Sequence, residues 1–197
     1  MNDAETRPAC EGILLAAGSS SRAGAFKPAM RLGGKPILLH ALEGMRPFCR
    51  RVIVVGGFSF GELERILGEV PDVILVRNEN PARGMFSSVR IGLEHVRADA
   101  CFILPADIPR VPPDVYRLLL EGSGRVRIPL WRGRRGHPVF VASGVIPAIL
   151  AEPEGVTLRD CLHRLGAATV STCHEEILLD VDTPQDLASL EARLAAG

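Results

Sequence analysis

The sequence shows no excess of charge of either sign, which excludes several classes of partner. Its 23 lysines and arginines balance 23 aspartates and glutamates over 197 residues. Such a chain has no long-range attraction to nucleic acid or to an anionic membrane surface. No apolar run approaches the ~20 residues that span a bilayer, and the polar segment 1–11 lacks the apolar core of a signal peptide. We therefore expect a cytoplasmic protein that binds neither nucleic acid nor membranes.

Cysteine is scarce, and its spacing argues against disulfides and structural metal. The five cysteines are odd in number and scattered, and none forms a Cys-x-x-Cys pair. Reduced thiols in a cytosolic protein are the simplest explanation of this usage. The nearest approach to a zinc cluster combines Cys161, His163, Cys173 and His174. Its spacing matches no structural zinc pattern, so we expect no zinc there.

The chain also lacks internal repeats, low-complexity tracts and linkers. We expect residues 1–197 to form a single domain, with 1–11 loosely ordered, because 47% hydrophobic and 23% charged residues are typical of a globular protein. Apolar strand-like runs alternate with helix-like ones, which predicts βαβ units and a mainly parallel sheet covered on both faces. Strands are expected over 12–17, 51–56, 73–76, 101–104, 126–131, 138–141 and 177–179, and helices over 35–45, 60–67, 85–96, 112–121, 145–150, 158–165 and 184–195.

A loop of small residues follows the first predicted strand. It is neither a Walker A loop nor a Gly-x-Gly-x-x-Gly motif, because no Gly-Lys-Ser/Thr and no such glycine spacing occurs. Its glycine and serines would still let backbone N–H groups approach a phosphate closely, and Arg22 and Lys27 would supply positive charge. The alternative is a mobile strand-to-helix turn that binds nothing.

Two acidic positions are expected at the same sheet edge as this loop. Asp107 follows the predicted strand at 101–104, and Asp180 and Asp182 follow the one at 177–179. Ligands of open α/β sheets collect at the carboxyl ends of the strands, and Mg²⁺ prefers one or two carboxylates together with phosphate oxygens. Asp107 and Asp182 are therefore candidate metal ligands. The alternative is that each is a turn residue, with Asp182 merely capping the last helix.

Six segments, in this order, resemble those of the MobA-like nucleotidyltransferases, and within that family the molybdenum cofactor cytidylyltransferases. They are Leu15-Ala16-Ala17-Gly18-x-Ser20-x-Arg22-x-Gly24-x-x-Lys27, Leu32-Gly33-Gly34-Lys35-Pro36-Ile37-Leu38, Asn80-Pro81-x-x-Gly84-Met85-x-Ser87-Ser88-Val89-x-x-Gly92-Leu93, Ala106-Asp107-Ile108-Pro109, Arg135-Gly136-His137-Pro138-Val139 and Asp180-Val181-Asp182-Thr183-Pro184-Gln185-Asp186-Leu187. The sequence departs from the family at Ala23, where Met or Phe is usual, and at Ala106, where glycine is usual. Neither change removes a charge or a ligand.

The resemblance implies a three-layer α/β/α fold like that of nucleotide-diphospho-sugar transferases, with a Rossmann-like, mainly parallel sheet and some antiparallel pairing. It also implies that CMP is transferred from CTP to molybdopterin, with Mg²⁺ or alternatively Mn²⁺ as cofactor. By this resemblance Arg22, Lys27 and Asp107 are catalytic, and Asp107 and Asp182 bind the metal. The nucleotide would be bound by Leu15, Ala16, Ala17, Gly18, Ser19, Ser20, Arg22, Lys27, Asn80, Gly84 and Ser88, and the acceptor by Arg135, Gly136, His137 and Pro138.

Several alternatives remain open at this stage. The base could be guanine, although the methyl group of Ala17 would leave less room beside a purine. The acceptor could be a sugar phosphate or phospholactate, and His137 could be a surface residue without a role. The basic stretch from Arg125 to Arg135 would suit an anionic pterin phosphate or form an ordinary solvated face. The chain could also be a non-catalytic carrier that hands the cofactor to a molybdenum hydroxylase. If the chain is instead an enzyme, a transient contact with such a hydroxylase is expected.

Overall fold

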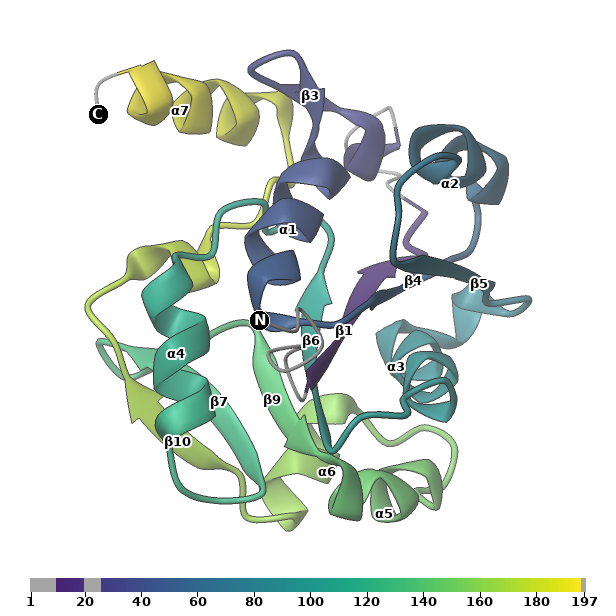
Figure 1. Cartoon of the computed structure of the whole chain (residues 1–197), viewed down its shortest axis with the longest axis vertical. Coiled ribbons are helices and arrows are strands. Elements are labelled where there is room, and N and C mark those ends of the chain that lie inside the picture. Colours follow the sequence, from purple (N-terminus) through teal and green to yellow (C-terminus); the bar gives the residue numbers. More distant parts are fainter. Residues whose placement is uncertain (1–9, 20–25, 196–197) are drawn as a thin grey trace, which may run out of the picture.

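A single twisted sheet runs through the centre of the molecule (Figure 1). The computed structural model describes residues 10–19 and 26–195. The strand order is β10-β7-β9-β6-β1-β4-β5, with β8 paired to β7 outside this path. β1 pairs in parallel with β4 and β6, whereas β9 runs antiparallel between β6 and β7. The strands are β1 Cys10–Ala16, β4 Val52–Gly56, β5 Val73–Arg77, β6 Ala100–Pro105, β7 Val126–Trp131, β8 Arg134–Arg135, β9 Val139–Ala142 and β10 Ala168–Ser171.

Helices cover both faces of this sheet, as expected for a three-layer α/β/α architecture. The first face packs against α1 (Ile37–Met45), α2 (Phe60–Leu67) and α4 (Pro113–Glu121). The opposite face packs against α3 (Met85–Glu94), α5 (Ile146–Leu150) and α6 (Leu158–Arg164). The last helix, α7 (Pro184–Ala195), lies at one end of the molecule beside the small hairpin of β2 (Arg31–Leu32) and β3 (Lys35–Pro36) (Figure 1).

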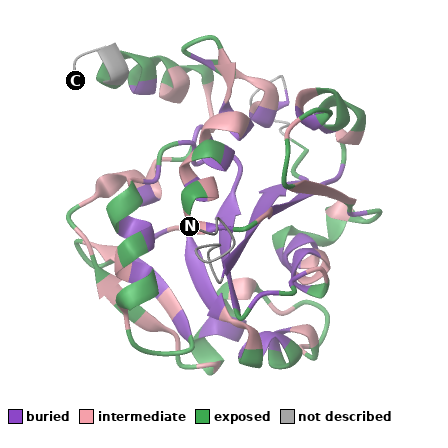
Figure 2. Cartoon of the chain, viewed as in Figure 1, coloured by how far each residue is buried: buried purple, intermediate pink, exposed green. Residues whose placement is uncertain are grey.

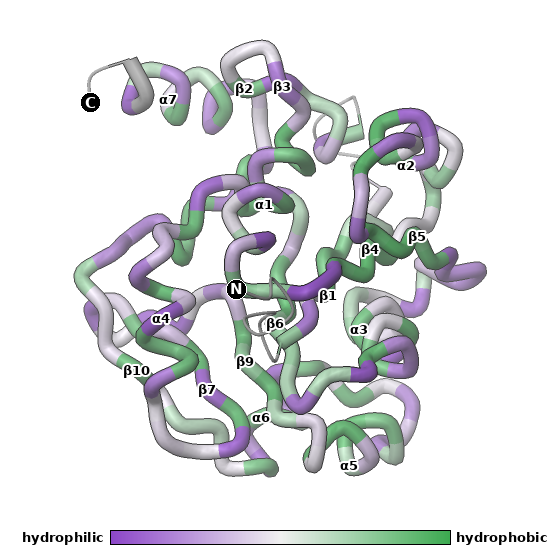
Figure 3. Tube along the Cα trace, in the orientation of Figure 1, coloured by the Kyte–Doolittle hydropathy of each residue, from purple (hydrophilic) through white to green (hydrophobic). Residues whose placement is uncertain are grey.

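The alternation of side chains along β1 divides the core into two layers. Leu14 belongs to the cluster under α1, α2 and α4, whereas its neighbours Ile13 and Leu15 belong to the cluster under α3, α5 and α6. Successive side chains of a strand point to opposite faces, so a strand covered on both sides must be apolar throughout. Buried residues accordingly gather along the central strands (Figure 2), and apolar residues run along β4 and β5 (Figure 3).

Most predicted elements are present within one or two residues, but three expectations were wrong. β1 begins at Cys10, so Cys10 and Glu11 lie in the sheet and not in a loose terminal segment. Pro36 ends β3 and precedes α1, which begins at Ile37. The apolar run 177–179 is no strand: Glu175–Leu178 forms a 3₁₀ turn that buries Ile177 under the sheet's first face.

The strand that the prediction missed is β10, Ala168–Ser171. Its four residues lie at the sheet edge, and none of them is fully buried. A short, half-exposed edge strand of small residues carries little hydrophobic periodicity, which is the signal that sequence reasoning depends on. Within the described residues, no helix is long and apolar enough to cross a bilayer. All five cysteines are described, and none of them forms a disulfide.

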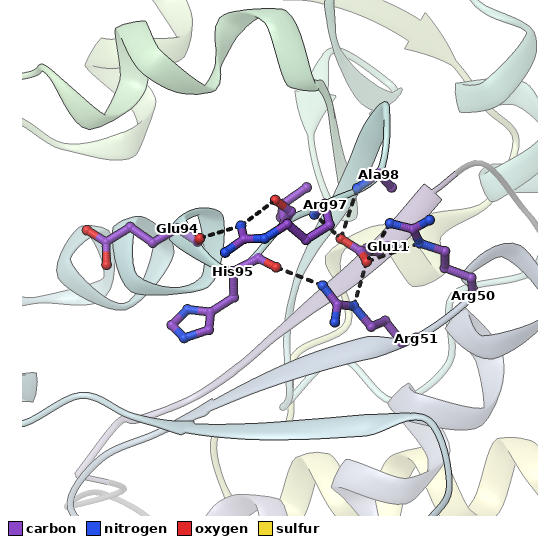
Figure 4. A network of polar contacts seen from close by, with 8 residues as sticks. Glu11, Arg50, Arg51, Glu94, His95, Arg97 and Ala98 are labelled. Atoms are coloured by element: carbon purple, nitrogen blue, oxygen red, sulfur yellow. Dashed lines mark hydrogen bonds and ion pairs between the residues drawn. The ribbon is translucent and has the colours of Figure 1, made fainter.

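A buried carboxylate joins three strands at the edge opposite their carboxyl ends (Figure 4). Glu11 is fully buried in β1, and its Oε1 accepts hydrogen bonds from Nε of Arg50 (3.1 Å) and Nε of Arg51 (2.5 Å), which precede β4. Its Oε2 accepts from the backbone N–H groups of Arg97 (2.5 Å) and Ala98 (3.2 Å), which precede β6. Although burial raises the pKa of Glu11, these hydrogen bonds and the Arg51 charge hold it below its ordinary value.

We expect Glu11→Gln to lower the free energy of unfolding by about 2 kcal/mol at pH 7, because one partner of a buried charged network is lost. The pKa of Glu11 is lower in the folded protein, so its stabilisation is present above the unfolded value of about 4.3 and is lost as the pH falls. The stability difference between the two proteins should therefore shrink below about pH 4. Urea denaturation at several pH values measures this.

The control is Glu43→Gln, which removes an exposed ion pair with Lys35. We expect it to change the stability by no more than about 0.5 kcal/mol. If both variants unfolded alike at every pH, Glu11 would not be the network's stabilising charge.

Candidate active site

Three loops meet where parallel strands β1, β4 and β6 end. Ala17 follows β1, Gly57 follows β4, and Asp107 follows β6 by two residues. The backbone N–H of Ala106 donates to the carbonyl of Leu15 at 2.9 Å, which aligns the first and third loops. Ala17 is buried, whereas Gly18 and Ser19 are exposed at the start of the glycine–serine loop. The loops after β1 and β6, which the sequence placed at one edge of the sheet, therefore do lie together there.

Gly57 permits the closest approach between these loops. A Cβ atom there would lie 2.7 Å from the Ala17 carbonyl oxygen and 2.9 Å from the Cβ atoms of both Ala17 and Pro81. Pro81 begins the 3₁₀ turn η3, Pro81–Arg83, next to the predicted base-binding residues Asn80 and Gly84. Gly57 thus brings the predicted phosphate loop and the predicted base loop into contact, a role that sequence reasoning did not assign to it.

Lys27 joins the two predicted metal ligands. Its Nζ lies 4.0 Å from Oδ2 of Asp107 and forms a hydrogen-bonded ion pair with Oδ1 of Asp182. The Lys27 side chain is 14% exposed, that of Asp107 is 28% exposed, and that of Asp182 is 43% exposed. The backbone N–H of Val181 donates to the carbonyl of Asp107 at 2.9 Å, which places the segment before α7 beside the end of β6.

The start of α7 is capped by residues other than Asp182. Thr183 Oγ1 accepts from the backbone N–H of Asp186 at 3.2 Å, and Asp186 Oδ2 accepts from the backbone N–H of Thr183 at 2.7 Å. This reciprocal pair is a capping box. Asp186 Oδ2 also accepts from the backbone N–H of Asp182 at 3.1 Å. The capping alternative for Asp182 is therefore wrong, and its carboxylate is directed to Lys27.

Burial raises the pKa of Asp107 above its ordinary value, while the Lys27 charge acts in the opposite direction. The nearby carboxylates of Asp180 and Asp182 raise this pKa further. An anion in such surroundings is stabilised by a cation within a few ångströms, as Lys27 is here. The pair of carboxylates suits a hard divalent cation for the same reason.

The predicted base-binding segment is organised by a residue that the sequence analysis did not single out. Asn78 is 3% exposed and directly follows β5, with its Oδ1 accepting from the backbone N–H of Asn80 at 2.9 Å. Its Nδ2 donates to Oγ of Ser87 and of Ser88, both at 2.9 Å. Ser88 is buried, so its hydroxyl supports the loop from within, whereas Asn80 and Gly84 are exposed. A polar residue directly after an apolar strand is the signal that could have identified Asn78.

A groove of about 1100 Å³ borders this segment. Asn80, Gly84 and Ser87 form part of one wall, and residues 150–159 form the other. Neither Lys27 nor the two predicted metal ligands line it. This groove therefore touches the predicted base loop and not the carboxylate pair.

The predicted acceptor loop is built against the 3₁₀ turn η5, Glu175–Leu178. A Cβ atom on Gly136 would lie 2.5 Å from the carbonyl oxygen of Ile177, and the backbone N–H of His137 donates to this oxygen at 3.0 Å. His137 is half-buried and not an exposed surface histidine. Burial lowers its pKa to about 4, while a hydrogen bond to the Ile103 backbone acts in the opposite direction. Its Nδ1 is buried without a hydrogen-bond partner among the described residues.

The basic stretch between Arg125 and Arg135 divides into two kinds of residue. Arg127 donates from Nε to the Gly124 carbonyl at 2.8 Å and stacks its guanidinium over Phe140 at 3.9 Å, so it holds the structure together. The other four arginines of the stretch are exposed, and two of them form β8, whose second residue, Arg135, begins the predicted acceptor loop.

Part of the predicted site lies outside the described residues, namely Ser20, Arg22 and the departure at Ala23. In the described part of the chain, no group of three His, Cys, Asp or Glu side chains could hold a metal by itself. The members of the rejected zinc cluster differ in burial, since Cys161 is buried and Cys173 is exposed.

A family model described as a MobA-like NTP transferase domain matches residues 12–170. The chain belongs to this family. The match covers the glycine–serine loop, the carboxylate Asp107 and the acceptor loop. The chain is therefore a nucleotidyltransferase, and the α/β fold predicted from its sequence is confirmed.

Two characterised relatives differ in the nucleotide that their names state. The molybdenum cofactor cytidylyltransferase of Escherichia coli strain K12 is 29% identical over 187 residues, covering 94% of this chain and 97% of the relative. The molybdenum cofactor guanylyltransferase of Cereibacter sphaeroides is 31% identical over 195 residues, covering 93% of this chain and 96% of the relative.

Solved structures share the fold at lower identity. Rv0371c from Mycobacterium tuberculosis H37Rv superposes with a TM-score of 0.80 at 22% identity, covering 95% of this chain and 100% of that one. Its complex with manganese gives a TM-score of 0.74 at 20% identity, covering 93% and 98%. At these identities the likeness shows the fold alone.

We expect Gly57→Ala to weaken nucleotide binding about tenfold or more, because the new methyl group would push Ala17 and Pro81 apart. Gly61→Ala is the control, since a Cβ there meets no atom closer than 4.0 Å. Titration of both purified variants with CTP and GTP by calorimetry measures the affinities, and thermal unfolding checks that each is folded. Equal affinities for the two variants would show that the contact at Gly57 does not position the nucleotide loops.

Proposed function

We propose that this protein transfers CMP from CTP to molybdopterin in a reaction that depends on a divalent metal and releases pyrophosphate. The observation that carries the proposal is the meeting of Lys27, Asp107 and Asp182 at the carboxyl edge of the sheet. The names of the E. coli and C. sphaeroides relatives support molybdopterin as the acceptor. A nucleotidyltransferase needs both a phosphate-binding cation and metal-binding carboxylates, and the proximity of Lys27 to Asp107 and Asp182 supports these roles.

The two carboxylates fit a magnesium or manganese ion. They come from separate segments, both contact one cation, and they remain partly exposed toward solvent. When bound, the metal supplies charge neutralisation for the triphosphate and for the departing pyrophosphate. Asp107 and Asp182 would hold it, while exposed backbone from Gly18 onward, with Ser20 and Arg22 beyond the described residues, would cradle the phosphates.

The reaction joins an oxygen of the acceptor phosphate to the α-phosphorus and breaks the bond between that phosphorus and the oxygen bridging to the β-phosphorus. A phosphate monoester has its second pKa near 6, so it is largely ionised at neutral pH and needs no strong general base. Lys27 would stabilise the negative charge that develops on the transferred and departing phosphates. Catalysis in this proposal therefore consists of positioning and charge stabilisation.

CTP is proposed as the preferred nucleotide, with GTP as the alternative that the guanylyltransferase relative supports. Ala17 is 7% exposed, and its methyl group lies against Gly57 and not in open space. We therefore propose that this methyl group acts by setting the spacing between the phosphate loop and the Pro81 turn. A wider or narrower gap between the phosphate loop and the Pro81 turn would change the space available beside the base.

His137 is proposed to bind the acceptor through Nδ1. The ring has a hydrogen bond to the Ile103 backbone while Nδ1 has no partner, so we assign Nε2 as the donor and Nδ1 of the neutral ring as a hydrogen-bond acceptor. A buried acceptor without a partner carries a desolvation cost that a ligand donor would remove. Pterin N–H groups are donors of the required kind.

We expect pyrophosphate release to depend on molybdopterin and to be faster with CTP than with GTP, ATP or UTP. Asp107→Asn should lower kcat at least about 100-fold while leaving the fold intact, because it removes the half-buried negative charge that the metal needs. Quenched-flow or coupled pyrophosphate assays with each nucleotide measure this. Equal turnover of GTP and CTP would overturn the base preference, and full activity of Asp107→Asn would overturn the metal assignment.

We expect His137→Gln to raise the KM for molybdopterin about tenfold, because its amide can keep the bond to Ile103 but cannot replace Nδ1. His137→Asn should raise it less, since its amide lies near the position of Nδ1. The KM for the nucleotide should stay unchanged in both. A parallel change in both KM values would indicate a general disturbance of the site and no acceptor contact.

A further inference from the structure

The contacts of Lys27 concern more than phosphate binding. Its ammonium group pairs with Asp182 and lies 4.0 Å from Asp107, so its single positive charge partly offsets the charge of both predicted metal ligands. These two carboxylates stand 80 and 155 positions further along the chain, as the residue numbers show. The side chain of Lys27 is 14% exposed, so solvent screens this arrangement only in part.

A divalent metal and the Lys27 ammonium group need the same oxygen atoms. Oδ1 of Asp182 is engaged by Nζ, and a metal coordinated there would stand within a few ångströms of a positive charge. Two cations at such a distance repel each other. The triphosphate is the group in the reaction that can accept the ammonium in place of the carboxylates.

We infer that Lys27 competes with the divalent metal for Asp107 and Asp182 until nucleotide binds. The Lys27 side chain then moves, so that its ammonium group pairs with the phosphates. Metal and nucleotide therefore enter the site together, and metal binds weakly without nucleotide. This inference rests on the proposed function, because it takes Asp107 and Asp182 as the metal ligands. It assigns Lys27 a role in the order of binding in addition to charge stabilisation.

The backbone on both sides of the Lys27–Asp182 ion pair is anchored. Asp182 is held by the hydrogen bond from its own backbone N–H to Asp186, which the capping box of α7 keeps in place. The backbone of Lys27 begins the 3₁₀ turn η1, Lys27–Ala29, and both neighbours, Phe26 and Pro28, are buried. The long, flexible stem of a lysine can carry its ammonium from one partner to another without any shift of these anchors.

The test measures Mn²⁺ binding by electron paramagnetic resonance on the whole chain at fixed pH. Without nucleotide, we expect Lys27→Met to bind Mn²⁺ at least about fivefold more tightly than the wild type, because the competing charge is gone. Lys35→Met is the matched control: Lys35 pairs with Glu43 and touches neither carboxylate, so its affinity should equal that of the wild type.

A second titration includes a non-hydrolysable CTP analogue. It should raise the Mn²⁺ affinity of the wild type at least about tenfold, and it should raise that of Lys27→Met by a smaller factor. Thermal unfolding of both variants checks that they are folded.

The outcomes separate the two proposals. Suppose that the wild type binds Mn²⁺ in the presence of the analogue, but that without nucleotide Lys27→Met binds Mn²⁺ no more tightly than the wild type does. The proposed competition by Lys27 is then wrong, and the metal site stands. If Asp107→Asn binds Mn²⁺ as wild type does, with and without the analogue, the metal assignment in the proposed function is wrong. If Lys27→Met binds Mn²⁺ more tightly than the wild type, and the double variant Lys27→Met/Asp107→Asn loses this gain, both the competition and the metal assignment are supported.

Discussion

Parallel pairing of β1 between β4 and β6 is the constraint on which the rest of the molecule depends. All seven residues of β1 are buried, so both faces of the sheet must be covered, and helices on the two sides do this. Parallel strands place all of their carboxyl ends at one edge. The predicted phosphate loop after β1, the close contact at Gly57 after β4 and the carboxylate after β6 meet there for this reason.

The opposite edge of the sheet serves a different purpose. There Glu11 joins the residues before β4 and before β6 through two arginines and two backbone N–H groups. A buried carboxylate with this many donors needs the three strands in one register, so the network ties together the same strands whose other ends form the site. The charge that supports the fold and the charges proposed to take part in the chemistry therefore lie at separate ends of β1.

Much of the site was predictable because its residues stand in local motifs. The glycine–serine loop, Asp107 and the loop around His137 each follow or precede an apolar run, and such runs are visible without a structure. Asn78 and Gly57 were missed because their importance lies in contacts with distant residues: the hydroxyls of Ser87 and Ser88 in one case, and Ala17 and Pro81 in the other. The burial of His137 was missed for the same reason.

The sequence by itself determined the α/β class, the order of most strands and helices along the chain, and the family, because hydrophobic periodicity and motif order are properties of the chain alone. Only the tertiary structure decided the conformation and the contacts of the segment before α7. Its apolar run was expected to be a strand, yet it is a 3₁₀ turn that buries Ile177 and leads Asp182 to Lys27. Thr183 and Asp186 cap the helix in place of Asp182. Local pattern cannot choose between a cap and an ion pair, because the choice depends on a lysine 155 positions away.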